Sequence, residues 1–552
     1  MSEMTDYIIV GAGSAGCIAA NRISADPSVQ VSLFEAGGKD SNPWIHIPVG
    51  YFRTMHNPHY DWCYTTEPDP GLNGRSLNWP RGKVLGGSSS LNGLLYVRGQ
   101  HEDYDRWAQM GNRGWSWADV GPIFEGFETF NRGPSEDRGQ SGELQVSDPR
   151  LKRAICERWI EAAVANGYPY NPDYNGPVQE GVGHFQLTMR NGLRCSSATA
   201  FLKPIRGRGN LAVETDAQVL RILIEDGRAM GVEYRRPDGT RGTLRARREV
   251  ILCAGAIGSP QLLMLSGIGP ADQLAALGIA VQRDMPEVGQ NLQDHLQARL
   301  VFKCREPTLN NEVRNPLKKA LIGLEYALMR TGPMTMAASL VFGFVKTRPE
   351  LATPDIQFHI QPWSADSPGE GVHPFAAFTQ SVCQLRPESR GSVTLRSAEA
   401  LEYPLIRPNY LATQTDQDTI VEGVRIARRI ARTEPLKSAI SEEFRPTKDL
   451  ESHDELLDWA RSNSTTIYHP TGTCRMGADD GAVVDPRLRV RGITGLRVAD
   501  CSIMPEIVSG NTNAPAMMIG AKLAQMVLED LKTDRSAGSR PQSGAQDYVN
   551  VA

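Results

Sequence analysis

The chain has 552 residues and a mass of 60.5 kDa, several times the usual length of a domain, so we expect at least two domains and exclude a small disulfide-stapled scaffold. Its 59 basic and 63 acidic side chains leave a formal charge of -4 without long runs of one sign, and a nucleic-acid partner is therefore not expected. The mean hydropathy of -0.35 and the lack of an apolar stretch of about 20 residues exclude an integral membrane protein.

The cysteines and the N-terminus predict the compartment. The nine cysteines are scattered without a CxxC pair, which predicts reduced thiols and no structural zinc site. His and acidic residues do not cluster with metal-ligand spacing, so we expect no metal. The chain passes from Met1 directly into an apolar run, without the basic start and small-residue cleavage site of a secretory signal. We therefore expect a cytoplasmic protein.

The first unit reads as strand, tight turn, helix and strand. A β-branched run at Tyr7–Val10 meets Gly11-Ala12-Gly13-Ser14-Ala15-Gly16, a helical stretch follows, and a second apolar run ends at Glu35. A GxGxxG turn in this context brings bare backbone N–H groups and a helix N-terminus to a pyrophosphate. Glu35 is placed to accept hydrogen bonds from adenosine ribose hydroxyls. The pattern predicts a dinucleotide site but does not decide between FAD and NAD.

Two later glycine clusters favour FAD. A Gly- and Ser-rich stretch, 82–92, predicts an ordered loop that enters a helix. Residues 211–248 alternate as β-hairpins and feed a buried run before Gly255-Ala256-Ile257-Gly258, which predicts a second strand-to-helix turn. These clusters indicate one ligand that is contacted along much of its length. Because the chain holds no second complete GxGxxG motif, we do not expect hydride delivery from NADH.

The remaining segments predict a substrate-facing sheet and a return to the first domain. Strand-like runs stand at 300–303, 356–361 and 392–395, with a helix candidate at 418–433. A strand at 495–500 precedes a helix from Pro515 that carries one apolar stripe. Residues 534–552 have a composition that cannot bury a core, so we expect a mostly disordered tail.

Among the ten histidines, His469 is the strongest candidate for a catalytic residue. Pro470 favours an extended backbone at His469 and so restricts the direction of its imidazole, although a lone loop histidine is more often structural. Asn511-Thr512-Asn513-Ala514-Pro515 stands where the last helix begins, and a helix start there would stabilise negative charge on a reduced flavin. The alternative is that Asn511 and Asn513 only cap this helix. Spacing alone leaves both interpretations open.

Together these motifs resemble the glucose-methanol-choline (GMC) family of FAD-dependent oxidoreductases, from Tyr7 to about Lys532. The resemblance is carried by the Gly11–Gly16 turn, the 82–92 stretch, Gly255–Pro260 leading to Ser266-Gly267-Ile268-Gly269, and the His469 and Asn513 loops. Within the family, the chain is most similar to choline-dehydrogenase-like bacterial alcohol dehydrogenases, including those that act on aliphatic alcohols and polyethylene glycols.

The resemblance implies an α/β FAD-binding Rossmann-like domain interleaved with an α+β substrate-binding domain built on an antiparallel sheet, an architecture like that of p-hydroxybenzoate hydroxylase. The expected FAD-binding segments are 1–150, 211–294 and 465–533. The expected substrate-domain segments are 151–210 and 295–464.

The resemblance also assigns site residues. It makes His469 the active-site base and Asn513 its partner, and it prefers Asn513 to Asn511 because the family places this residue directly before the x-Pro step. Leu91 stands where some members carry the histidine that tethers FAD, so we expect FAD to be bound noncovalently. The expected cofactor contacts are Gly11, Gly13, Ser14, Ala15, Gly16, Glu35, Ala36, Val84, Gly87, Ser88, Asn92, Gly93, Leu94, Val219, Ala254, Gly255, Asp500, Asn511, Ala514 and Pro515.

The implied reaction oxidises a primary alcohol to an aldehyde, with proton abstraction at His469 and hydride transfer to flavin N5. Electrons would pass to a quinone or another acceptor. The alternatives are an oxidase that uses dioxygen and releases hydrogen peroxide, a non-redox lyase resembling hydroxynitrile lyase, and a flavin-binding interaction or storage protein.

Three further expectations concern the acceptor, His295 and the aromatic residues of the substrate sheet. A quinone acceptor would bring the protein into peripheral contact with the inner membrane, although no amphipathic helix with a basic face stands out. His295 is expected to be a structural hydrogen-bonder rather than a ligand. Phe342, Phe344 and Trp363 fall in the expected substrate sheet, and the sequence does not assign them to the pocket.

Overall fold

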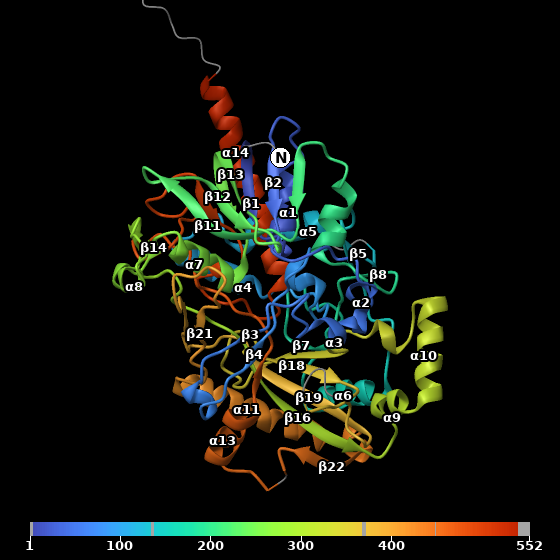
Figure 1. Cartoon of the computed structure of the whole chain (residues 1–552). Helices are drawn as coiled ribbons and strands as arrows, with labels where there is room; N and C mark the ends of the chain where they lie inside the picture. Colours follow the sequence, from blue (N-terminus) through green and yellow to red (C-terminus); the bar gives the residue numbers. More distant parts are fainter. Residues whose placement is uncertain (1–3, 134–136, 367–370, 448, 539–552) are drawn as a thin grey trace, which may run out of the picture.

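The computed structural model of the chain describes residues 4–133, 137–366, 371–447 and 449–538. Two seven-stranded sheets organise these residues, one at each end of the molecule (Figure 1). The chain crosses between the sheets several times, because strands from distant parts of the sequence neighbour one another in both.

The first sheet has a parallel centre extended by an antiparallel meander. Strand β1 is paired in parallel with β2 on one side and β13 on the other. Its Tyr7–Val10 part is buried, as a near-continuous apolar run between two covered faces predicts. The sheet order is β10-β2-β1-β13-β12-β11, with β24 on β13. The strands are β1 (Met4–Val10), β2 (Val31–Phe34), β10 (Leu211–Glu214), β11 (Gln218–Glu225), β12 (Arg228–Arg235), β13 (Arg241–Leu252) and β24 (Leu496–Val498).

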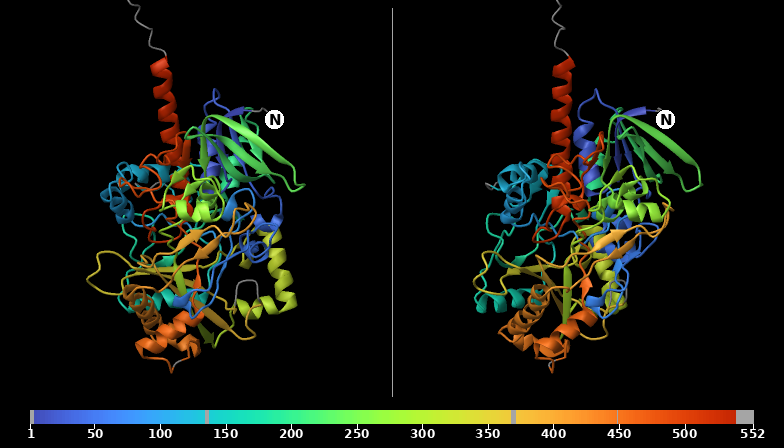
Figure 2. Two further views of the ribbon diagram at one scale, coloured as in Figure 1. Left: turned by 60° about the vertical axis from the view of Figure 1, so that its left-hand side comes forward. Right: turned by 90° about the vertical axis from the view of Figure 1, so that its left-hand side faces the viewer.

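Helices α1 (Ser14–Ile23) and α14 (Asn513–Gly538) pack against each other beside this sheet. A side chain at Gly520 would meet the Ala15 carbonyl oxygen at 2.3 Å, so glycine permits the close approach. Figure 2 shows the far end of α14 projecting beyond the domain. The prediction of disorder from residue 534 is wrong for 534–538, because helix α14 continues there and its exposed Arg535 pairs with Asp26 at 3.0 Å. Residues 539–552 lie outside the described part.

The second sheet is antiparallel, in the order β22-β16-β19-β18-β17-β7 with β23 on β16. Helices α6 (Ala154–Ala165), α11 (Gln414–Ala431) and α13 (His453–Asn463) contact its strands and cover one face (Figure 1). The helix expected at 418–433 is α11. The strands expected at 300–303 and 356–361 are part of β16 and the whole of β18. The strands are β7 (Gly181–His184), β16 (Leu296–Cys304), β17 (Val341–Val345), β18 (Ile356–Gln361), β19 (Ala377–Gln384), β22 (Ile440–Arg445) and β23 (Thr465–Thr466).

Two local predictions need correction. The run at 392–395 does not join the second sheet, because β20 (Ser392–Thr394) pairs only with β21 (Leu405–Arg407). Strand β23 pairs with β16 although residues 465–466 were placed in the FAD-binding segment. The other short strand pairs are β3 (Tyr64–Thr65) with β4 (Asn78–Trp79), β5 (Glu128–Phe130) with β6 (Leu144–Val146), β8 (Met189–Arg190) with β9 (Leu193–Arg194), and β14 (Ile268–Gly269) with β15 (Arg283–Asp284).

The glycine-rich stretch 82–92 forms a loop with one 3₁₀ turn, η3 (Gly87–Ser90), but it does not enter a helix as expected, because the next helix begins only at His101. Gly255 opens helix α7 (Gly255–Leu265) as expected. The remaining helices lie around the two sheets. They are α2 (Pro43–His46), α3 (Tyr51–Thr54), α4 (His101–Gln109), α5 (Trp117–Phe127), α8 (Ala271–Ala276), α9 (Leu309–Arg314), α10 (Pro316–Met329) and α12 (Leu436–Ala439).

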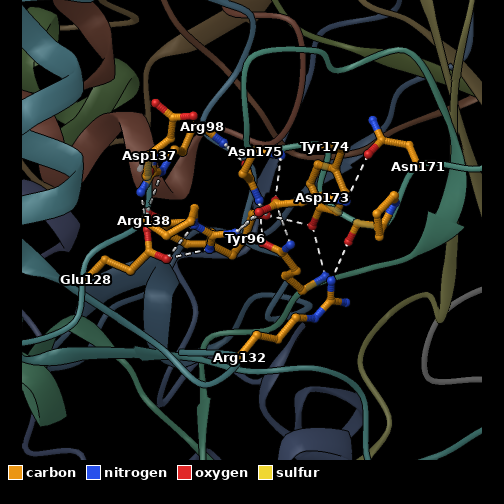
Figure 3. A network of polar contacts seen from close by, with 12 residues as sticks. Tyr96, Arg98, Glu128, Arg132, Asp137, Arg138, Asn171, Asp173, Tyr174 and Asn175 are labelled. Atoms are coloured by element: carbon orange, nitrogen blue, oxygen red, sulfur yellow. Dashed lines mark hydrogen bonds and ion pairs between the residues drawn. The ribbon is translucent and has the colours of Figure 1, made fainter. Parts of the chain in front are cut away.

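A buried ionic network joins β5 to the segments that follow residues 95 and 170 (Figure 3). The Glu128 carboxylate accepts from the guanidinium groups of Arg98 and Arg138, and all three side chains are fully buried. Arg138 also reaches Asp173 at 2.8 Å. Because every charge has an opposite partner, the network joins distant chain segments without leaving an uncompensated ion.

We expect Glu128→Gln to destabilise the protein by about 3–5 kcal/mol, because it leaves two buried guanidinium groups with too little negative charge. The matched control is Glu225→Gln, which breaks an exposed pair with Arg245 and should leave the melting temperature unchanged. Thermal and urea unfolding measure both variants. Equal melting temperatures for the two variants would contradict the expected importance of the buried network.

Candidate active site

One cavity, of about 360 Å³, lies between the two sheets and is lined by both. Most predicted cofactor positions line this cavity. The predicted positions that are buried and do not line it are Gly16, Val84, Leu94, Ala514 and Pro515. Trp363 also lines the cavity, whereas Phe342 and Phe344 lie in a separate apolar cluster. The predicted positions in the wall are Gly11, Gly13, Ser14, Ala15, Glu35, Ala36, Gly87, Ser88, Asn92, Gly93, Val219, Ala254, Gly255, His469, Asp500, Asn511 and Asn513.

The glycines at the first-sheet end form a cradle that suits a pyrophosphate. Added side chains at Gly11 and Gly16 would strike backbone oxygens at 2.4 and 1.9 Å, so these glycines allow strand β1 and helix α1 to pack. A side chain at Gly13 would meet nothing closer than 4.0 Å and would fill the cavity itself. This is the division of roles that a dinucleotide turn requires, and the residues present fit such a cofactor.

The 82–92 loop closes the cradle from the other side. The Gly86 N–H donates to the Ala12 carbonyl at 2.8 Å. Gly87 has a φ of +52°, and a side chain there would approach Gly13 Cα to 2.7 Å. The loop therefore lies directly on the first turn, which explains why this stretch is rich in glycine.

We expect Gly87→Val to reduce bound flavin by about tenfold or more, since the new side chain pushes the loop away from Gly13. Gly126→Ala is the matched control, because a side chain at Gly126 in α5 meets nothing within 4 Å. The ratio of flavin to protein absorbance after purification measures the effect. A Gly87→Val protein with a full complement of flavin would contradict this role.

Glu35 directly follows strand β2 and is buried at the cavity wall. Its carboxylate accepts from the N–H groups of Ala12 at 3.0 Å and Gly37 at 2.9 Å. Burial raises the pKa of Glu35 to about 7. The carboxylate thus fixes the turn after β1, and its contact with a ribose stays a prediction.

Helices α1 and α14 both begin at the cavity. The Ser14 hydroxyl donates to Asn513 Oδ1 at 2.7 Å, so the first residues of the two helices are joined. Their N-terminal dipoles favour negative charge at this point. Asn513 therefore contacts Ser14 and not His469, and the predicted pairing of Asn513 with His469 is wrong.

His469 lies where the second sheet meets the cavity. Its backbone N–H donates to Asp294 Oδ1 at 2.7 Å, and Asp294 Oδ2 accepts from the hydroxyls of Thr466 at 2.6 Å and Tyr410. The preceding residue, Tyr468, has a φ of +70°, a conformation that is rare outside glycine and occurs at functional sites. The surrounding bonds hold the imidazole in one place.

A chain of hydrogen bonds sets the tautomer of His469. His295 Nε2 lies 2.9 Å from the Leu385 carbonyl oxygen, which can only accept, so His295 carries its proton on Nε2. His295 Nδ1 is then an acceptor, and it lies 3.0 Å from His469 Nδ1, which must donate. His469 Nε2 is therefore unprotonated, and its lone pair faces the cavity.

Asn511 is the partner of that nitrogen. Its Nδ2 lies 3.2 Å from His469 Nε2, and its Oδ1 accepts from Gln357 Nε2 at 3.3 Å. The loop before it is anchored because Ser509 donates through both N–H and hydroxyl to Asp103, at 2.7 Å each. Asn511 presents an amide donor next to the basic nitrogen.

Burial keeps both imidazoles neutral. It lowers the pKa of His295 to about 4, and it lowers the pKa of His469 well below its ordinary value, with a further contribution from the neighbouring histidines. Both rings are therefore uncharged at neutral pH, in agreement with the tautomers above. A neutral imidazole with an unprotonated nitrogen can accept a proton.

Sequence reasoning missed several residues of this arrangement. His295 was expected to be a structural hydrogen-bonder, and its partner is His469 itself. Asp294, Gln357 and Asp103 carried no motif that could have singled them out. A usable signal for Asp294 and His295 is that they directly precede β16, which pairs with Thr465–Thr466 just before His469.

Comparison with known proteins identifies the family of this chain. The GMC oxidoreductase family models match residues 5–297 and 387–520. The chain is 43% identical to an alcohol dehydrogenase [acceptor] of Pseudomonas putida, over 95% of this chain and 96% of that protein. It is also 43% identical to human mitochondrial choline dehydrogenase, over 94% and 89%. A structure of Aspergillus oryzae formate oxidase, concerned with FAD modification, superposes with a TM-score of 0.89 at 29% identity, covering 96% and 99%.

The chain belongs to the GMC oxidoreductase family. It is a flavoprotein that uses FAD and an oxidoreductase that acts on alcohol donors. The predicted fold class, a Rossmann-like FAD-binding domain interleaved with a sheet-based substrate domain, is confirmed.

Two absences concern the part of the chain that the structure describes. None of the helices there is both long and apolar enough to cross a membrane. No group of three or more His, Cys, Asp or Glu side chains in those residues is arranged to hold a metal ion.

Proposed function

We propose that this protein oxidises a primary alcohol to an aldehyde, with His469 Nε2 as the base that receives the hydroxyl proton. The observation that carries this proposal is the directed chain from the Leu385 carbonyl through His295 to His469, which leaves Nε2 unprotonated inside the cavity. Bound FAD supplies the acceptor for the hydride that leaves the carbinol carbon. The glycine cradle, Ser14 and the start of α14 would hold that cofactor.

The residues around Nε2 position the alcohol. A hydroxyl group between His469 and Asn511 donates to Nε2 and accepts from Asn511 Nδ2, so its proton points at the base. The buried Asp294 carboxylate holds the backbone of this base in place, because it accepts from the His469 N–H. General-base assistance of this kind accelerates a reaction by about 10²- to 10⁴-fold.

The electrons then pass to a quinone or another acceptor rather than to dioxygen. The names of the two relatives at 43% identity, an acceptor-dependent alcohol dehydrogenase and a choline dehydrogenase, support this choice. Rapid return of the oxidised spectrum in air, with release of hydrogen peroxide, would instead identify an oxidase.

Anaerobic mixing of the holoenzyme with alcohols tests the proposal. We expect the flavin absorbance to bleach with a primary alcohol and the corresponding aldehyde to form in equal amount. A lyase, or a protein that only stores flavin, would leave the absorbance unchanged.

A further inference from the structure

The face of the second sheet that looks into the cavity is polar. Arg299 on β16 and His359 on β18 both pair with Ser381 on β19, so the three residues form one row across the sheet, and Arg299 and His359 line the cavity. The neighbouring row contains Gln357, which contacts Asn511. Two residues advance a strand by about 7 Å. The Arg299 row therefore lies about this distance along the sheet from the Gln357 row, which contacts Asn511 beside His469.

Arg299 has no counterion. Within the described residues its guanidinium makes no hydrogen bond or ion pair. Asp366 is an electrostatic neighbour, but it pairs with Arg445 at 2.6 Å and with His373 at 3.2 Å. The carboxylates that line the cavity belong to Glu35 and Asp500 at the first-sheet end, and Asp500 accepts from the Gly255 N–H and the Ser259 hydroxyl. Arg299 is thus an uncompensated cation in the cavity wall.

Two further donors in the wall are unused. Among the described residues, the Tyr51 hydroxyl and the Trp363 Nε1 are buried without a hydrogen-bond partner, and each residue is 5% exposed. Tyr51 is also an electrostatic neighbour of Arg299. Buried polar groups are normally paired, so unpaired donors beside an unpaired cation indicate a ligand that brings acceptor oxygens.

We propose that the alcohol substrate carries a carboxylate, which Arg299 binds at the second-sheet end of the cavity while the hydroxyl group lies between His469 and Asn511. This inference rests on the proposed function for the position of the hydroxyl group. A guanidinium binds a carboxylate with two parallel charge-assisted hydrogen bonds. The same charge repels a cationic alcohol such as choline.

Binding and turnover test the proposal separately. Titration of the holoenzyme with hexanoate, followed by flavin absorbance, should give a Kd about 10- to 100-fold lower for the wild type than for Arg299→Gln, with Arg299→Lys between them. In turnover, ω-hydroxy acids should exceed 1-alkanols of the same length in kcat/KM by a similar factor, and Arg299→Gln should abolish that preference. The control Lys303→Gln removes another cation of strand β16, one that pairs with the exposed Glu442, and should keep the preference.

The two proposals fail differently. If alkanols bleach the flavin but hydroxy acids are no better substrates, or if hexanoate binds the wild type and Arg299→Gln equally, the carboxylate inference is overturned and the proposed oxidation stands. If no alcohol bleaches the flavin while hexanoate binding still depends on Arg299, the proposed oxidation falls and the anion site remains.

A second, independent feature is the apolar face of helix α10, which stands at the flank of the molecule (Figure 1). Tyr326 anchors the helix, because it is buried and its hydroxyl donates to the Gly192 carbonyl at 2.9 Å. The leucines follow the 4, 3, 4 spacing of one helical stripe. They are strongly exposed: Leu317 by 78%, Leu321 by 63%, Leu324 by 55% and Leu328 by 75%, and Met329 beside them by 61%.

Basic residues flank this stripe. Lys318 and Lys319 are exposed, and within the described part of the chain neither has an ion-pair partner. Arg314 and Arg330 stand at the two ends, and Glu325 is the acidic residue of the helix. An apolar stripe bordered by cations matches an anionic lipid surface. A twofold dimer through the same face would bring like charges together.

We infer that α10 lies in the surface of an anionic membrane, with its leucines among the acyl chains. At 14 residues the helix is about 21 Å long, shorter than the ~30 Å hydrocarbon core, so it would lie in the interface and not cross it. The 3₁₀ turn at 333–335 contacts both α10 and the 3₁₀ turn at 48–50, which leads into α3 at the cavity wall. Contact through α10 therefore brings that wall near the lipid.

Co-sedimentation of the full chain with phosphatidylglycerol vesicles tests this inference. We expect binding to the anionic vesicles, weaker binding to phosphatidylcholine, and at least about a tenfold loss in Leu321→Glu/Leu328→Glu. The control Leu401→Glu changes another exposed leucine and should bind like the wild type. Two results would overturn the membrane assignment. One is wild-type protein that does not bind phosphatidylglycerol vesicles, and the other is a wild-type dimer on size exclusion that becomes a monomer in the double variant.

Discussion

Replacing His469 by alanine is expected to lower kcat by about 10²- to 10⁴-fold while the protein keeps its yellow flavin. The loss follows because His469 Nε2 is the lone pair that the His295 chain directs into the cavity. Flavin should stay bound, because the glycine cradle and the helix starts that would hold it lie at the other end of the cavity.

Steady-state turnover with a soluble acceptor and the flavin absorbance of the purified variant measure the two halves of this expectation. His453→Ala is the matched control, since His453 is a histidine of α13 that pairs with Asp418 far from the cavity. Near-normal kcat in His469→Ala would refute the role of this residue as the base.

The nucleotide end of the site was predictable because its signals are local. A glycine turn between β1 and α1 is encoded within a few residues, and the steric reasons for Gly11 and Gly16 follow from backbone approach alone. Such constraints do not depend on distant segments. The strand, turn and helix around Gly11 therefore appear in the structure where the sequence places them.

The reacting end was only partly predictable because it is assembled from distant segments. Asn511 and Asn513 are equivalent in sequence, and only the start of α14 decides that Asn513 meets Ser14 while Asn511 meets His469. His295 lacked a motif as well, since its role depends on the pairing of β16 with β23. Spacing along a chain does not report the direction of a side chain in a loop.

Helix α10 shows a third limit of prediction from sequence, which concerns the partner of an apolar helix face. Its leucine stripe reads like the core-facing side of an ordinary amphipathic helix, and the sequence analysis found no basic amphipathic helix for a membrane. The structure differs because α10 packs through Tyr326 and turns its leucines outward. Hydrophobic periodicity predicts a helix and its apolar face, but the partner of that face is a property of the whole fold.

The two asparagines give the sharpest test of the corrected site. Asn511→Ala is expected to lower kcat by about 10²- to 10³-fold, because the amide donor beside His469 Nε2 is lost from the position where charge develops on the substrate oxygen. Asn513→Ala removes a hydrogen bond between the starts of α1 and α14. We expect it to cost about 0.5–1.5 kcal/mol of stability or flavin affinity and to leave kcat within about tenfold of the wild type.

Parallel measurements of kcat, melting temperature and flavin dissociation separate these outcomes. In Asn511→Ala the flavin should stay bound and the melting temperature should change little, because the loop remains anchored through Ser509 and Asp103. The reverse pattern, with turnover lost in Asn513→Ala and kept in Asn511→Ala, would restore the pairing that the family resemblance implied. It would also mean that binding of FAD rearranges the start of α14, since only a movement of that helix could bring Asn513 from Ser14 to His469.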